Sequence, residues 1–104
     1  MLVFGLGNGG LAAGIAKKAG ARLGKIKIEE FPDGETYLRF LDKVKGHEVA
    51  LVQTMNPNPN QALIEIVFAG RAARELGAKK VIAVIPYLAY MRQDKMFNEG
   101  ECVS

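Results

Sequence analysis

The strongest constraint on the fold is a run of five consecutive apolar residues, Val81 to Ile85. Strands with one face in water alternate apolar and polar residues, whereas the strands of a parallel sheet are covered on both faces and are continuously apolar. The run therefore predicts a strand in the middle of a parallel sheet, with helices packed on both sides. It is far shorter than the roughly 20 residues that a membrane-spanning helix needs.

Shorter patterns predict the other elements of an α/β fold. Apolar or alternating runs predict strands at residues 1–6, 25–30, 36–41 and 48–54. Apolar residues at helical spacing predict one helix over residues 9–20, which Gly20 ends, and a second helix that Gly77 ends. In this order the elements imply an open sheet with helices on its faces. No helix is predicted after the last strand, so we expect the sequence to lack the segment that covers it.

The second helix has a defined predicted start. Asn58 can cap it, Pro59 suits its first position, and Gln61 is expected to complete a capping box. The core-facing stripe of this helix is expected to contain five apolar side chains: Leu63, Ile66, Val67, Ala73 and Leu76.

Composition and charge exclude several classes of protein. The chain has 104 residues, which is one domain or a piece of one, and its formal net charge of +3 comes from scattered residues rather than a nucleic-acid-binding tract. Cys102 is the one cysteine, so no disulfide forms within the chain, as is typical of a cytoplasmic protein. His47 is the one histidine, and no Asn or Asp close to it in sequence completes a catalytic triad. The N-terminus lacks the pattern of a secretory signal.

A glycine-rich turn, Gly5 to Gly10, joins the first predicted strand to the first predicted helix. Its spacing matches the dinucleotide fingerprint G-x-G-x-x-G, in which amides at a helix N-terminus hold a pyrophosphate. Glu29 and Glu30 follow about twenty residues later, where the fingerprint places an acid for a ribose hydroxyl. This interpretation predicts an NAD-binding module. The alternative is that the glycines only permit a tight turn between strand and helix.

A second group of candidate residues lies in the segment Phe31-Pro32-Asp33-Gly34-Glu35. Proline presets one backbone angle and Asp-Gly accepts turn geometry, so the flanking strands are expected to form a hairpin. The ring of Phe31 can stack on a purine, and the carboxylates of Asp33 and Glu35 can accept hydrogen bonds from its amino group or from ribose hydroxyls. The alternative is a solvated acidic turn in which Phe31 fills a gap in the core.

A third group follows the strand at Val81 to Ile85, at the position where open α/β sheets bind their ligands. Arg92 can fork onto phosphate oxygens, and Lys95 can add a point charge. Gln93 can both donate and accept hydrogen bonds, while Asp94 can bind metal-bound water or orient Arg92. The alternative is a polar surface loop in which these charges only neutralise one another.

The motifs, in this order, resemble the N-terminal part of ribose-phosphate pyrophosphokinases. The resemblance rests mainly on F-P-D-G-E at residues 31–35, G-x-x-V-x-L-V-Q at 46–53 and I-P-Y-x-x-Y-x-R-Q-D-K at 85–95. It implies an α/β fold of the phosphoribosyltransferase-like type, with an open, mostly parallel sheet and a hairpin (flag) extension, incomplete at the C-terminus. Residues 1–104 would then be the ATP-contacting N-terminal domain, without the domain that holds ribose 5-phosphate.

The resemblance also implies a reaction and a set of partners. Family members transfer the β,γ-diphosphoryl group of MgATP to the C1 hydroxyl of ribose 5-phosphate, which gives 5-phosphoribosyl 1-diphosphate and AMP for nucleotide biosynthesis. They are homo-oligomers, dimers or hexamers, in which each ATP site is shared between subunits. By this resemblance the hairpin turn reaches a neighbouring subunit. The implied ATP-binding residues are Phe31, Asp33, Glu35, Arg92, Gln93 and Asp94.

The resemblance has departures and gaps. Met91 replaces a common alanine, and Phe97 and Asn98 stand where many relatives carry charges. The family's metal-binding histidine, catalytic lysine and arginine, and ribose-phosphate loop are expected beyond Ser104, and His47 lies in the wrong loop to replace that histidine. The chain alone is therefore expected to hold no metal ligand and to be inactive, with Mg²⁺ arriving together with ATP. A non-catalytic regulatory relative that binds nucleotide is an alternative to the enzyme, as is the NAD-binding module.

Overall fold

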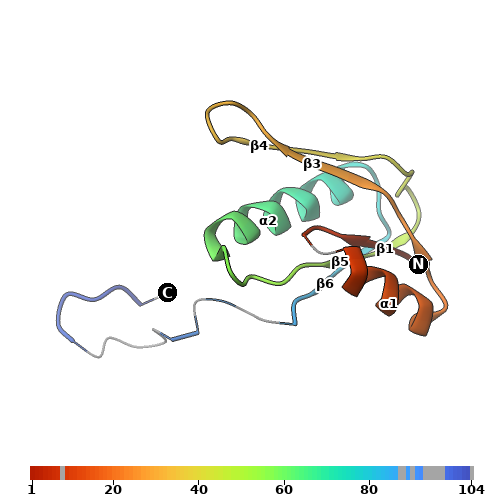
Figure 1. Cartoon of the computed structure of the whole chain (residues 1–104). Helices are drawn as coiled ribbons and strands as arrows, with labels where there is room; N and C mark the ends of the chain where they lie inside the picture. Colours follow the sequence, from red (N-terminus) through yellow and green to blue (C-terminus); the bar gives the residue numbers. More distant parts are fainter. Residues whose placement is uncertain (8, 87–88, 90, 93–97, 104) are drawn as a thin grey trace.

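A four-stranded parallel sheet forms the centre of the computed structural model of this chain (Figure 1). The structure describes residues 1–7, 9–86, 89, 91–92 and 98–103. In spatial order the strands are β2 (Arg22–Leu23), β1 (Leu2–Gly5), β5 (Glu48–Val52) and β6 (Lys80–Val84). Every neighbouring pair is parallel, and β1 pairs with β5 over its whole length. The predicted open, mostly parallel α/β sheet is therefore confirmed.

Side chains of the two central strands alternate between the two faces of the sheet. On one face Val3 and Ala50 pack against α1 (Gly9–Ala19), whose Ala12 and Ala16 are buried. The small side chains let this helix approach the sheet closely. The other face carries larger side chains under α2 (Pro59–Glu75), namely Leu2, Phe4, Val49 and Leu51. The two faces differ because residues i and i+2 of a strand share a face.

β3 (Ile26–Glu30) and β4 (Thr36–Phe40) form an antiparallel hairpin that is separate from the main sheet and lies over α2 (Figure 1). The base of the hairpin packs on the core, where the rings of Phe40 and Phe4 meet edge to face with centroids 4.8 Å apart. Gly24 stands just before the hairpin, and a Cβ at this position would lie 2.4 Å from the Phe4 ring. A glycine is thus needed where the chain passes the buried ring. The predicted hairpin is confirmed.

Asn58 is the N-cap residue of α2 as predicted, but the predicted capping hydrogen bonds of its side chain and of Gln61 are absent. The helix begins at Pro59, and Gly77 follows its end with φ +89°. Asn58 makes no capping hydrogen bond through its side chain. Gln61 does not complete a capping box either, because both hydrogens of its amide are donated elsewhere, to Thr36 and to Glu65.

The buried stripe of α2 matches the predicted stripe only in part, at Ile66 and Ala73. Its buried residues are Ala62, Ala69 and Ala73, and Ile66 packs beside them. Three residues expected in the core are exposed instead, namely Leu63, Val67 and Leu76. The reason is that the helix lies close to the sheet, where alanine side chains fit and larger ones do not.

Two features of the sheet differ from the prediction. β6 is expected in the middle of the sheet, but among the described residues it is an edge strand, with β5 as its one partner. Its Val81 and Val84 still pack on opposite faces, which accounts for the continuous apolar run. The two-residue strand β2 has no counterpart among the predicted elements, because so short a segment carries no periodic pattern.

Candidate functional site

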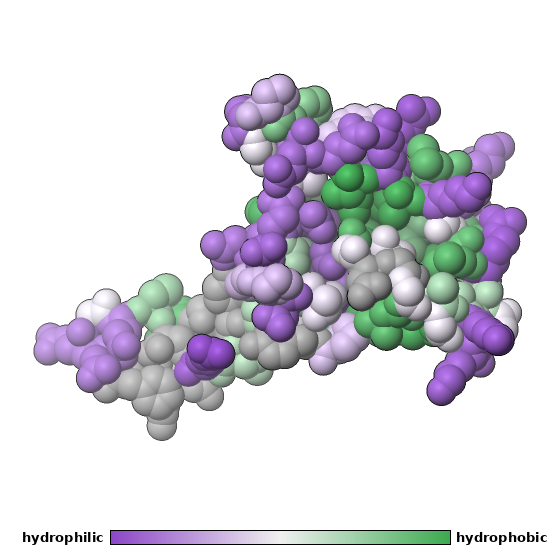
Figure 2. All heavy atoms as spheres, viewed as in Figure 1, coloured by the Kyte–Doolittle hydropathy of each residue, from purple (hydrophilic) through white to green (hydrophobic). Residues whose placement is uncertain are grey.

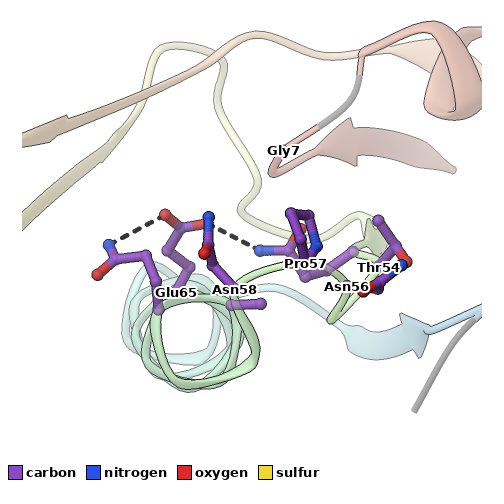
Figure 3. Close-up of a pocket in the computed structure, with 9 residues that line it drawn as sticks. Gly7, Thr54, Asn56, Pro57, Asn58 and Glu65 are labelled. Atoms are coloured by element: carbon purple, nitrogen blue, oxygen red, sulfur yellow. Dashed lines mark hydrogen bonds between the residues drawn. The ribbon is translucent and has the colours of Figure 1, made fainter. Parts of the chain in front are cut away.

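The order of the strands creates a topological switch point between β1 and β5. The chain leaves β1 through α1 to reach β2 on one side, and it leaves β5 through α2 to reach β6 on the other side. Open α/β sheets bind ligands where the two directions diverge, beyond the carboxyl ends of the strands. A cavity of about 370 Å³ lies there, and we call it the switch-point cavity. It is lined by Gly7, by the loop after β5, and by Gln61, Ala62 and Glu65 of α2 (Figure 3).

Hydrogen-bonded amide and carboxylate side chains form one wall of the switch-point cavity. Gln53 Nε2 donates to Glu65 Oε1 over 2.8 Å. Gln61 Nε2 donates to Glu65 Oε2 over 3.2 Å and to Thr36 Oγ1 over 3.0 Å. Gln53 is only 3% exposed, and a Cβ at Gly7 would lie 2.8 Å from its Oε1. Gln53 and Glu65 therefore join three segments of the fold: the turn after β1, the end of β5 and the start of α2.

Neither Gln53 nor Glu65 was predicted as a site residue. One signal in the sequence points to Gln53, since a carboxamide directly after a buried strand must find hydrogen-bond partners or remain unsatisfied. Glu65 carries no comparable signal, because a single acid on an amphipathic helix is normally a solvated residue.

The hairpin tip, which we define as residues 31–35, carries three of the predicted ligand residues. Gly34 N–H donates to the Phe31 carbonyl over 2.8 Å, and Phe31 N–H donates to the Glu35 carbonyl over 2.7 Å. Gly34 has φ +92°, a conformation that favours glycine. This turn places Phe31, Asp33 and Glu35 together on the surface, as the turn chemistry predicted.

Asp33 is held by its own turn. The Glu35 N–H donates to Asp33 Oδ1 over 3.0 Å. This backbone hydrogen bond, together with a side-chain interaction with Glu35, holds the pKa of Asp33 below its usual value. The Asp33 side chain is therefore an anion at neutral pH, and it can accept hydrogen bonds from a ligand but cannot donate one.

Phe31 lies on the surface and does not fill a gap in the core, so that alternative is wrong: 49% of the residue is exposed. Its ring meets Tyr37 edge to face with centroids 5.8 Å apart, which orients the ring. A hollow of about 340 Å³ lies between the hairpin tip and α2, where Gln61, Ile64 and Phe68 line it. In Figure 2 the hairpin tip presents hydrophobic and hydrophilic residues side by side. The hollow therefore suits a flat apolar group with polar edges.

Arg92 is exposed on the segment that follows β6. The other two predicted ligand residues of this segment, Gln93 and Asp94, lie outside the described residues. Within the described residues no hydrogen bond or ion pair joins Arg92 to the hairpin tip. In Figure 1 the hairpin tip lies above α2 and the chain leaves β6 below it, so the tip and Arg92 are carried by separate parts of the fold.

The dinucleotide interpretation of Gly5 to Gly10 fails on topology. The strand beside β1 on the α1 side is β2, whereas Glu29 and Glu30 end β3 in the separate hairpin. Glu29 instead forms an exposed ion pair with Lys27 at 3.3 Å. The acid that would hold a ribose hydroxyl is therefore not at the switch point. Glycine at position 7 lets the end of the Gln53 side chain lie against this turn.

His47 lies at the opposite end of the sheet from the candidate site. It directly precedes β5, and its carbonyl accepts a hydrogen bond from the Lys79 N–H over 2.8 Å. As expected, it is in no position to serve a site at the carboxyl ends of the strands. In the part of the chain that the structure describes, no helix combines the length and the apolar character that crossing a membrane requires.

Comparison with known proteins identifies the family. A family model described as the N-terminal domain of ribose phosphate pyrophosphokinase matches residues 1–104. A ribose-phosphate pyrophosphokinase of Pyrococcus furiosus is 42% identical over 104 residues, and one of Saccharolobus solfataricus is 38% identical over 104 residues. Each match covers 100% of this chain and 36% of the relative, so the chain spans about a third of the length of these curated relatives.

A solved structure agrees with these matches. The crystal structure of phosphoribosylpyrophosphate synthetase from Mycobacterium smegmatis has a TM-score of 0.89 and 29% sequence identity to this chain. The likeness covers 99% of this chain and 35% of that one. The fold, the sequence motifs and the relatives agree, and the chain belongs to the ribose-phosphate pyrophosphokinase family of enzymes.

Proposed function

We propose that the complete protein is a ribose-phosphate diphosphokinase. It transfers the β,γ-diphosphoryl group of MgATP to the C1 hydroxyl of ribose 5-phosphate and gives 5-phosphoribosyl 1-diphosphate and AMP. The observation that carries this proposal is the exposed hairpin tip, with an oriented aromatic ring and two carboxylates, on a chain of this family.

Residues 1–104 serve as the N-terminal domain that contacts ATP, and ribose 5-phosphate binds elsewhere in the complete protein. The length of the relatives supports this division, because the chain covers 36% of them. Residues 1–104 alone are inactive, since a diphosphoryl transfer needs both substrates in one site.

The hairpin tip contacts the adenosine part of ATP. The ring of Phe31 offers an exposed apolar face for stacking, and Tyr37 holds it from the side. Asp33 and Glu35 accept hydrogen bonds from the amino group of a purine or from ribose hydroxyls. The same carboxylates repel phosphate groups. The triphosphate therefore points away from the tip.

The segment after β6 contacts the phosphates. Arg92 can donate two parallel hydrogen bonds to phosphate oxygens and can stabilise the charge that develops during transfer. Gln93 and Asp94 bind the same nucleotide beside it. Positioning and charge stabilisation are most of what this kind of transfer requires from a protein.

Two copies of the protein share each ATP site, in a dimer or a hexamer. The separation of the hairpin tip from Arg92 within one chain supports this arrangement, because a second copy can bring its own tip to Arg92. Ile64, Val67 and Phe68 of α2 are exposed beside the hairpin. Burying them against another subunit would remove apolar surface from water.

Mg²⁺ enters the reaction as a complex with ATP. The described residues contain no group of three or more His, Cys, Asp or Glu side chains that could hold a metal ion, so we assign them no metal ligand. Bound to the nucleotide, Mg²⁺ offsets the charge of the phosphates. We place the protein in the cytoplasm, because Cys102 is a free, exposed thiol that stays reduced there.

The test is incubation of the complete protein with ATP, Mg²⁺ and ribose 5-phosphate, followed by phosphorus NMR. Equal amounts of AMP and of a sugar C1 diphosphate are expected, and omission of any one component should abolish both signals. Formation of ADP would indicate a different phosphoryl transfer and refute the proposal. Saturable ATP binding without turnover would favour the regulatory relative instead.

A further inference from the structure

The two halves of the hairpin are attached to the body of the fold in different ways. From the base to the middle, Ile26, Ile28, Leu38 and Phe40 pack on the core. The half nearer the tip, which holds Glu29, Glu30, Thr36 and Tyr37, contributes no residue to that core and is exposed or half-exposed. Among the described residues, the hydrogen bond that joins this half to α2 runs from Gln61 Nε2 to Thr36 Oγ1 over 3.0 Å. Since apolar contacts with α2 are not directional, this bond is the specific attachment of the tip.

Thr36 is the first member of a chain of hydrogen bonds that ends at the central sheet. Gln61 also donates to Glu65, and Glu65 accepts a second bond from Gln53 (Figure 3). The backbone N–H of Gln53 donates to the Val84 carbonyl over 3.0 Å. The chain therefore connects the first residue after the hairpin tip with the carboxyl ends of β5 and β6.

The chemistry of this chain depends on one carboxylate. Each oxygen of Glu65 receives one amide donor, and both hydrogens of the Gln61 amide are used. Hydrogen bonds to a charged acceptor are shorter and stronger than neutral ones. Each donor meets its own carboxylate oxygen, so an amide in place of Glu65 turns an NH2 group toward one of the two donors and loses that bond. The chain can therefore be broken by changing one atom.

We propose that Gln53, Glu65 and Gln61 form a positioning relay that sets the angle between the hairpin tip and the strand ends. The inference rests on the proposed function, in which the tip of one copy meets the segment after β6 of another copy, so the angle of the tip on its own fold sets where it reaches the neighbouring ATP. Their amide and carboxylate groups bond to one another, so in this proposal they act through Thr36 at one end and through the end of β6 at the other.

The angle matters because a small rotation of the hairpin produces a larger movement at its tip. Phe31 lies three residues beyond Ile28, roughly 10 Å at the usual strand rise, so a rotation of about 10° there moves the tip by about 2 Å. A shift of that size takes Asp33 and Glu35 out of hydrogen-bond reach of the adenosine, because such bonds form only over roughly 2.5–3.2 Å between heavy atoms. Apolar packing below the tip does not define its position to that precision, whereas a directional bond beside the tip does.

The test compares the same substitution at two positions of α2 in the complete protein. Glu65→Gln breaks the relay. Glu75→Gln is the matched control, because Glu75 lies outside the relay in an exposed ion pair with Arg71 at 3.9 Å. Hydrogen exchange of residues 29–37 reports on the tip, and steady-state kinetics report on the substrates.

Glu65→Gln should speed exchange of the tip and raise the KM for ATP, each by about three- to tenfold, which corresponds to one lost hydrogen bond. The kcat and the KM for ribose 5-phosphate should stay within about twofold of wild type. Glu75→Gln should change none of these quantities.

A second pair of variants keeps the test valid if Glu65→Gln fails to fold. Thr36→Val removes the hydroxyl that accepts from Gln61 while keeping the shape of the side chain, and Thr36→Ser restores the hydroxyl. Thr36→Val should reproduce the effect of Glu65→Gln, and Thr36→Ser should behave as wild type.

Faster exchange of the tip without a change in the KM for ATP would overturn the positioning role. Equal behaviour of the relay variants and their controls would overturn the relay itself. If the wild-type protein makes no 5-phosphoribosyl 1-diphosphate, the proposed function fails, but the exchange comparison still decides whether the relay holds the tip.

Discussion

Substitution of Gly24 by alanine should destabilise the fold through one identifiable collision. A Cβ at position 24 would lie 2.4 Å from Phe4 Cε1 and 2.6 Å from Phe4 Cζ, well inside normal carbon–carbon contact. The Phe4 ring is fully buried and meets Phe40 edge to face, so it has no free space to enter. Overpacking of this kind costs about 1–3 kcal/mol. That is a large share of the roughly 5–15 kcal/mol that stabilises a folded domain.

Urea unfolding of the 104-residue chain, followed by far-UV circular dichroism, measures this cost. With a slope of roughly 2 kcal/mol per molar urea, a loss of about 2 kcal/mol lowers the midpoint by about 1 M. The matched control is Gly14→Ala in α1, where nothing lies within 4 Å of the added Cβ. That substitution should stabilise the chain by about 0.5–1 kcal/mol, because alanine favours a helix more than glycine does.

A smaller side chain at position 4 tests whether the collision is the cause. In a Phe4→Leu background the ring edge is absent, so Gly24→Ala should cost at least about 1 kcal/mol less than it does in wild type. An unchanged midpoint for Gly24→Ala, or the same cost in both backgrounds, would refute the reasoning.

Three further predictions concern the proposed ATP contacts of the complete protein. Arg92→Ala should reduce turnover by about a hundredfold or more, because it removes charge stabilisation in the transition state; wild-type rates in a steady-state assay would contradict this assignment. Phe31→Ala should raise the KM for ATP more than the KM for ribose 5-phosphate, and an equal rise in both would remove the case for stacking on adenine. Because the Glu35 N–H donates to the Asp33 carboxylate, the pKa of Asp33 lies below its usual value. The turn bond is therefore fully present above the usual pKa and is lost as the pH falls through the lowered one. An NMR titration of Asp33 with an ordinary midpoint would disprove this.

The features that adjacent residues control were predictable from the sequence. Pro32, Asp33 and Gly34 carry the turn geometry in their own backbone preferences, so the hairpin and the grouping of Phe31, Asp33 and Glu35 at its tip followed from local chemistry. Every strand except β2 and both helices followed from the spacing of apolar residues, and Gly20 and Gly77 mark the helix ends.

The partner of each element was not predictable in the same way. Several faces of α2 carry apolar residues, and only the short distance to the sheet selects the face with Ala62, Ala69 and Ala73. Gln61 has the spacing of a capping residue, yet its amide bonds to Thr36, 25 positions away in sequence. β6 has the composition of a central strand but pairs with β5 alone in the described part of the chain.

The residues of the candidate site show the same difference between local features and long-range contacts. The hairpin tip and Arg92 were recognisable from short motifs, whereas the switch-point cavity joins Gly7, Gln53 and Glu65 from three distant segments. Backbone preferences act within a few residues and are written in the local sequence. Close packing and hydrogen bonds between distant side chains depend on where the folded chain places them. The tertiary structure alone therefore showed which face of α2 is buried, and it alone showed the relay and the cavity.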